Sequence, residues 1–214
     1  MNRLATLALA ASAFAISLRA YAYDTQLDSE SIREAYFLGR RSDQQTIGFL
    51  GSYFKRLPMP EHGPYISQIA LYTPYAQVVM NSWRHTLGYS AQQAERDYQA
   101  AGDIIKVRVQ IEFTPTYSAV RKVVPDSGPS NTVGYELRSE DFWKEFRFSL
   151  VQSDKLVKPL LVKGTPIYDD SGFRGAEVWL EFAATEVRSG EAIVEIASPD
   201  GGLAAAKFDL SRLR

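Results

Sequence analysis

The sequence predicts an α+β protein in which a helical N-terminal region packs on a C-terminal antiparallel β-sandwich. Two observations predict the two parts. Between residues 28 and 102 the chain carries repeated helix-start signals, each a serine or threonine just ahead of an apolar stripe of helical period. From residue 103 onward, short runs of alternating apolar and polar residues are separated by turn residues. We therefore predict a mainly helical region at 23–102 and an antiparallel β-sandwich at 103–214.

The first 22 residues have the composition of a secretory signal peptide. Arg3 provides a positive start, an apolar run rich in alanine and leucine follows at residues 4–18, and residues 20–22 have the small-x-small form that signal peptidase cleaves. The run is shorter than the about 20 apolar residues that span a bilayer. We expect cleavage before Tyr23, no stable membrane insertion afterwards, and export to the periplasm or the extracellular medium. The alternative is a retained membrane anchor, which the polar Arg19 just after the run disfavours.

Composition excludes several classes of function. The sequence has no cysteine, which excludes thiol catalysis, cysteine metal sites, disulfides and a lipid-anchored cysteine. Without residues 1–22, which include two arginines, the chain keeps 22 basic and 25 acidic residues, a net charge of about −3, and it has no basic tract. We therefore expect no nucleic-acid partner. No metal-binding motif, phosphate loop or dinucleotide fingerprint occurs, so we expect no metal and no cofactor.

Four helices are predicted in the N-terminal region. Ser31, Ser42 and Ser90 each precede a glutamate or glutamine by three residues, the spacing of a capping box. Thr73 is followed by proline, which favours an N-cap with proline in the first turn. The stretch at 65–72 fits either a helical turn or a strand. The helices are expected at residues 30–40, 43–56, 74–85 and 91–101.

The β-rich part begins with the most regular alternation in the chain. Every second residue from Ile105 to Phe113 is apolar, so one face of this strand is expected to be buried and the other polar. Further strands are expected at residues 119–124, 133–138, 145–151, 158–168, 175–187, 192–197 and 203–210. About seven short strands separated by turns are typical of an immunoglobulin-like sandwich. Because the cysteine and tryptophan spacing of antibody domains is absent, we predict that architecture alone.

Two histidines are available for acid–base chemistry. His62 lies in a proline-rich loop at 58–64, where Glu61 is placed to orient it, so the pair is our catalytic candidate. The alternative is a solvated loop histidine without a role. His85 falls in the last turn of a predicted helix, which favours contact with free helix carbonyls. Because no known catalytic motif occurs, we expect a non-enzymatic protein, with hydrolysis of glycan or peptide through carboxylates and His62 as the alternative.

A binding face is predicted on the strand at 175–187. The alternation there points Val178 inward and places Trp179 on the opposite face between Glu177 and Glu181. Tryptophan beside carboxylates on an open sheet can stack on a sugar or anchor a partner protein. The alternative is that the helical region covers Trp179, because a large apolar ring seldom stays exposed without a function.

A second aromatic pair, Phe142 and Trp143, stands just before a predicted strand and is expected to plug a corner of the core. Export, the sandwich pattern and the lack of a catalytic motif together predict an exported binding protein. Its expected partner is another protein or a cell-surface glycan. The sequence does not specify the oligomeric state.

Overall fold

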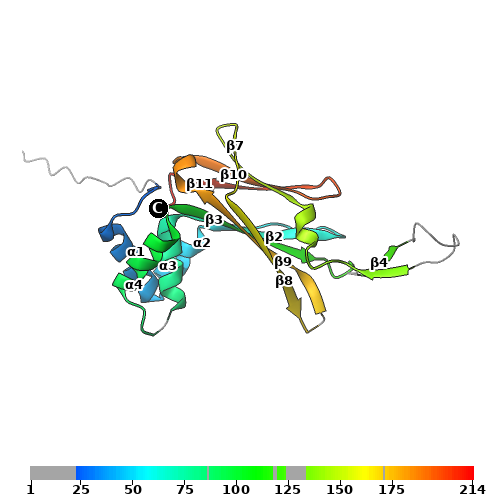
Figure 1. Ribbon diagram of the computed structural model, residues 1–214, viewed down its shortest axis with the longest axis horizontal. Coiled ribbons are helices and arrows are strands. Elements are labelled where there is room, and N and C mark those ends of the chain that lie inside the picture. The colour runs from blue at the N-terminus through cyan, green and yellow to red at the C-terminus, as the bar shows by residue number, and fades with distance from the viewer. Residues whose placement is uncertain (1–22, 86, 118–119, 124–133, 171) are drawn as a thin grey trace, which may run out of the picture.

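The computed structural model describes residues 23–85, 87–117, 120–123, 134–170 and 172–214. Within these ranges the chain forms four α-helices, two larger antiparallel sheets and a two-stranded ribbon (Figure 1). The fold is therefore mixed α+β, as predicted. The predicted signal peptide at 1–22 lies outside the described residues. No helix in the described ranges is long and apolar enough to cross a membrane.

The helices are α1 (Ser29–Arg41), α2 (Gln44–Gly51), α3 (Pro74–Arg84) and α4 (Ala91–Ala101). Two of the predicted N-caps are confirmed. Thr73 Oγ1 accepts a hydrogen bond from Ala76 N at 3.2 Å, and Ser90 Oγ accepts one from Gln93 N at 3.2 Å. Each bond satisfies a backbone donor that the first helical turn leaves free, so the sequence alone starts these two helices.

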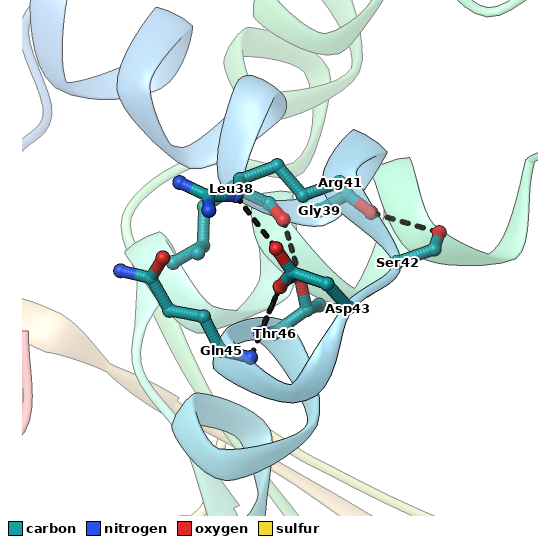
Figure 2. Close-up of polar contacts among 7 residues, drawn as sticks. All are labelled: Leu38, Gly39, Arg41, Ser42, Asp43, Gln45 and Thr46. Carbon is teal, nitrogen blue, oxygen red and sulfur yellow. Dashed lines mark hydrogen bonds and ion pairs between the residues drawn. The ribbon is translucent and has the colours of Figure 1, made fainter.

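Aspartates, rather than the predicted serines, cap the other two helices. Asp28 caps α1 and Asp43 caps α2. At the start of α2, Asp43 Oδ1 accepts from two backbone N–H groups at 3.0 and 3.1 Å, and Oδ2 lies 2.9 Å from Arg41 Nε (Figure 2). The Thr46 N–H and then Arg41 hold the pKa of Asp43 below its usual value. Thr46 Oγ1 donates to Leu38 O at 2.6 Å, which ties α2 to α1. Ser42 instead ends α1 in the left-handed region, with φ of 50°.

The predicted helix at 43–56 is too long. Helix α2 ends at Gly51, and β1 (Phe54–Arg56) follows after two residues. Phe54 continues the helical spacing of the apolar residues before it, but it pairs with Ala70 of a neighbouring strand. A pairing between residues distant in sequence therefore overrides a local periodicity.

The larger sheet has five strands in the order β1-β2-β3-β9-β8, all antiparallel. Its central strand β3 alternates between half-buried and buried side chains over all ten residues, as the sequence predicts. Strands β1 and β2 belong to the region predicted as mainly helical, so the sheet crosses the predicted boundary after residue 102. Besides β1, the strands are β2 (Pro64–Tyr72), β3 (Ile104–Phe113), β8 (Leu161–Asp169) and β9 (Gly172–Ala183).

The smaller sheet has four antiparallel strands in the order β11-β10-β6-β7. They are β6 (Arg147–Gln152), β7 (Lys155–Val157), β10 (Glu191–Ala197) and β11 (Leu203–Asp209). Strands β4 (Val120–Val123) and β5 (Gly134–Leu137) pair only with each other in the described part of the chain, and they project from one end of the molecule (Figure 1). Two short 3-10 helices, η1 (Phe142–Glu145) and η2 (Ala184–Glu186), complete the described elements.

The two larger sheets share an apolar core, and the helices carry a second apolar cluster. Fully buried side chains from both sheets meet in the first cluster, among them Leu71, Val107, Val109, Leu150, Val178, Leu180, Val194 and Phe208. The second cluster joins α1, α3 and α4 through Ile32, Ala35, Val79 and Ala94. Helix α3 takes part in both clusters, because Ala76 and Met80 belong to the first. The helices gather at one end of the sheets, beside the C-terminus (Figure 1).

The predicted corner plug is confirmed. Phe142 and Trp143 of η1 are 1% and 8% exposed, and both belong to the core between the sheets. Phe142 lies against the rings of Phe113 and Phe173, with centroids 5.1 and 5.8 Å away. Phe142 and Trp143 therefore fill the end of this core at which several aromatic rings meet edge to face.

Candidate functional site

Trp179 lies on the face of the five-stranded sheet opposite to Val178 and Leu180, and it packs at the margin of the first apolar cluster. Its neighbours Val178 and Leu180 are fully buried, whereas Trp179 is half-buried, in agreement with the alternation in the sequence. We call this side of the sheet the outer face. Its side chains that matter for the site are Tyr72, Lys106, Arg108, Glu177, Trp179 and Glu181.

Side chains of the sheet itself hold Trp179 in place. Its ring stacks on Tyr72, with centroids 6.1 Å apart and planes inclined by 25°, and its Nε1–H donates to Glu177 Oε1 at 2.7 Å. Glu181 is engaged elsewhere, because its Oε1 lies 3.2 Å from Lys106 Nζ. Of the three predicted binding residues, Glu177 and Trp179 thus contact each other, while Glu181 forms a separate ion pair across the sheet.

Arg108 is the cation next to this pair, and it stands directly opposite Trp179 in the strand register. Its Nη1 lies 3.5 Å from Glu177 Oε2, a long distance for an ion pair, since the other oxygen of Glu177 serves Trp179. Arg108 Nε is buried and has no hydrogen-bond partner among the described residues. The side chain is only 20% exposed. Arg108 therefore keeps donors and charge that its neighbours do not fully satisfy.

A cavity of about 260 Å³ opens beside Arg108, where α2 and α3 meet the outer face. We call it the Arg108 cleft, and define it by Phe54, Gln68, Tyr72, Met80, Trp83 and Arg108. Arg84 also reaches the cleft, and Trp83 is 44% exposed at its rim. Tyr72 lines the cleft and stacks on Trp179, so the cleft and the Trp179 region form one continuous surface.

The sequence did not reveal this cleft. Its walls come from β1, β2, β3, α2 and α3. The polar residues of β3 predicted only a face that is wet or covered. Chemically, the cleft combines aromatic rings, a side-chain amide and guanidinium groups. Aromatic walls favour flat or ring-shaped ligands, and guanidinium favours carboxylate, phosphate or sulfate in a planar two-point contact.

A second cavity of about 400 Å³ lies between the edges of the two larger sheets, and we call it the seam groove. Residues 57–66 line one side and residues 196–205 the other, and its apolar walls include Leu57, Pro58, Pro60, Ile66, Ile196 and Leu203. His62, Ser198 and Asp200 supply polar atoms there. The Ser198 hydroxyl donates to Asp200 and is the first cause that holds the pKa of this carboxyl below its usual value.

The structure does not join His62 to the carboxylate of Glu61. His62 Nδ1 lies 2.9 Å from Thr116 Oγ1, which donates to the backbone carbonyl of Glu61 at 3.0 Å. No hydrogen bond or ion pair between the two predicted catalytic side chains occurs in the described ranges. His85 contacts the end of α3 as predicted, with Nδ1 2.8 Å from Asn81 O. The described residues hold no cluster of three side chains suited to bind a metal.

No protein-family model matches this chain, and comparison with curated proteins finds no match. The geometry alone therefore selects the candidate site, which is the Arg108 cleft together with the adjoining Trp179.

Proposed function

We propose that the protein is an exported, non-enzymatic binding protein and that the Arg108 cleft, with Trp179 beside it, binds an acidic sugar unit of a cell-surface glycan. One observation carries the proposal. Arg108 lies at an aromatic cavity with a buried Nε that has no partner within the described structure. A buried donor that makes no hydrogen bond costs about 1–3 kcal/mol of free energy, and a charged donor costs more. A ligand carboxylate that pairs with the Arg108 guanidinium from the cleft offsets part of this cost.

The walls of the cleft suit a sugar ring. Trp83 provides exposed flat apolar surface, while Gln68 offers an amide for hydroxyl groups. The volume of about 260 Å³ is just below the roughly 300–1,000 Å³ of pockets for drug-sized ligands. A single ring with a carboxylate therefore fits the cleft better than a large cofactor does, and Trp179 is placed to stack on a neighbouring unit.

The two acids beside Trp179 already have partners on the outer face. Glu177 accepts from Trp179 Nε1, and Glu181 forms an ion pair with Lys106. Both carboxylates therefore hold neighbouring side chains in place, which is consistent with a fixed binding surface.

Two further parts of the proposal concern export and architecture. Export is supported by the signal-peptide composition of residues 1–22. An immunoglobulin-like sandwich, with the helical N-terminal region packed on it, is supported by the core that the two larger sheets share and by the place of α3 in both apolar clusters. N-terminal sequencing of the protein recovered after expression of the full chain tests cleavage before Tyr23.

Calorimetric titration tests the ligand. The purified protein is titrated with an oligosaccharide that contains glucuronic acid and, separately, with the matched neutral oligosaccharide that contains glucose. We expect binding of the acidic form, and a loss of about tenfold or more in affinity for Arg108→Gln, because a charge-assisted contact is removed. Lys163 of β8 stands opposite Trp179 on the side away from Arg108. Lys163→Gln is therefore the matched control, and it is expected to bind as wild type does.

Equal binding of both oligosaccharides, or equal affinity of Arg108→Gln and wild type, contradicts the proposal. The alternative is hydrolysis of glycan or peptide through Glu61 and His62, and its support is the position of His62 in the seam groove. Product release from oligosaccharides or peptides that disappears in both Glu61→Gln and His62→Asn would favour that alternative.

A further inference from the structure

The free edge of β11 offers a row of backbone groups. β11 is the edge strand of the four-stranded sheet and pairs with β10 along all seven residues. Leu210 N donates to Gly190 O at 2.8 Å, which identifies one of the directly hydrogen-bonded pairs of this ladder. Because such pairs alternate, the backbone groups of Leu203, Ala205 and Lys207 point away from β10. No hydrogen bond reaches the backbone groups of these three residues from any described residue.

The other edges of the two larger sheets are short or interrupted. β1 and β7 have three residues each. β8 is longer, but it contains Pro166, and its pairing with β9 is irregular between Ile167 and Tyr168. Prolines, bulges and short edge strands are devices that prevent a sheet from pairing with another chain. β11 has neither a proline nor a bulge, and the lysine that it carries, Lys207, pairs with Glu191 of β10. Its edge therefore stays open to an additional strand.

The β11 edge also borders the seam groove. Ala204 and Ala205 line this cavity, and Leu57 and Ile66 lie across it on the segment before β2 and on β2 itself. A strand added to β11 turns alternate side chains to opposite faces. One set of these side chains therefore faces the apolar walls of the groove, while the other set faces solvent. Backbone pairing supplies affinity in this mode of recognition, and the groove selects apolar side chains at alternate positions.

We propose that the seam groove binds an extended peptide segment of a partner protein, which adds to β11 as a further strand. The occupant is a peptide rather than a glycan or lipid, because the groups left open on β11 are backbone donors and acceptors at strand spacing. Its side chains at alternate positions are apolar, because Leu57, Pro58 and Ile66 provide no hydrogen-bonding side chain. This site is distinct from the Arg108 cleft, and no residue is shared between them.

Ala205→Pro is the variant that isolates strand addition. Proline removes the Ala205 N–H, which points to the free edge, and leaves every hydrogen bond between β10 and β11 in place. Ala205→Ser keeps the N–H and is the matched control. The probes are capped peptides of seven residues, the length of β11, with valine, leucine or phenylalanine alternating with threonine. Copies of the same peptides, N-methylated at alternate residues, lack the N–H groups along one edge. That edge therefore cannot pair with β11.

Titration and amide exchange on the full protein test the proposal. We expect wild type and Ala205→Ser to bind at least one unmethylated peptide, with affinity lower by about tenfold or more for Ala205→Pro and for the N-methylated copy. The amides of Leu203, Ala205 and Lys207 are expected to exchange more slowly with peptide bound. Thermal unfolding checks that Ala205→Pro is folded.

Four results overturn the proposal. They are no binding of any probe at millimolar concentration, equal binding to Ala205→Pro, equal binding of the N-methylated copies, and a protein dimer that already protects the β11 amides without peptide. Arg108→Gln is expected to bind the peptides as wild type does. This variant therefore separates a failure at the seam groove from a failure of the proposed glycan site.

Discussion

The indole of Trp143 covers the backbone of Gly164, and a Cβ atom added to Gly164 would lie 2.2 Å from Trp143 Cε2. Trp143 comes from η1, between the two-stranded ribbon and β6, whereas Gly164 belongs to the edge strand β8. The contact thus attaches an edge of the five-stranded sheet to the corner plug. Only glycine lets the ring approach the strand this closely, which gives Gly164 a packing role.

Gly164→Ala is therefore expected to destabilise the protein by about 1–3 kcal/mol, the usual range for overpacking a core contact. Urea denaturation measures the change in the free energy of unfolding. The double variant Gly164→Ala with Trp143→Leu is expected to lose less than the sum of the single variants, because the smaller side chain makes room for the methyl group. A loss below about 0.5 kcal/mol for Gly164→Ala contradicts the contact.

Gly39 permits the close approach of α1 and α3. A Cβ atom at this residue would lie 2.3 Å from Val79 O and 2.8 Å from Ser82 Cβ. Gly39→Ala is expected to destabilise the protein by about 1–3 kcal/mol, since the two helices must separate. Gly48→Ala in α2 is the matched control, because a Cβ there meets no atom within 4 Å. The control is expected to raise stability by about 0.5–1 kcal/mol through helix propensity, and thermal or urea unfolding compares the two.

Thr73 and Ser90 both cap helices, but they differ in burial. Thr73 is fully buried, and its hydroxyl both accepts from Ala76 N and donates to Arg214 O. Ser90→Ala is expected to cost about 1 kcal/mol, the typical value for an exposed cap. Thr73→Ala is expected to cost more, about 2–3 kcal/mol, because the Ala76 N–H that loses its acceptor is buried and because Arg214 O keeps only the Tyr53 hydroxyl of its two hydroxyl donors. Equal costs in urea denaturation would show that the contact with Arg214 does not contribute.

The raised pKa of Tyr98 predicts that the folded protein loses stability at alkaline pH. Burial, followed by the hydrogen bond to Asp103, raises the pKa of Tyr98 to about 12 from 10.0. A raised pKa means that folding favours the neutral phenol, so its contribution is complete below about pH 10 and is lost as the pH rises toward 12. The free energy of unfolding, measured from pH 9 to 12, is expected to fall less steeply in Tyr98→Phe. An unchanged slope in this variant would exclude Tyr98 as a cause.

The candidate site could be predicted from the sequence only in part. The alternation in β9 indicates that Trp179 faces away from Val178, and the structure agrees. The ring that stacks on Trp179, however, is Tyr72 of β2, and the cation opposite it is Arg108 of β3. No local pattern links residues so far apart. The neighbouring pair Glu61 and His62 shows the converse, because adjacency in sequence does not bring their side chains into contact.

Elements whose causes are local follow directly from the order of the residues. Thr73 and Ser90 start α3 and α4, because each cap reaches a donor only three residues ahead. The strict alternation at 105–113 specifies a strand with one buried face. Contacts between distant segments are needed to place Phe54 in a strand, to cross α1 and α3 at Gly39, and to leave β11 as an open edge. These features depend on contacts between distant segments, whose energies exceed the weak local preferences of the residues involved.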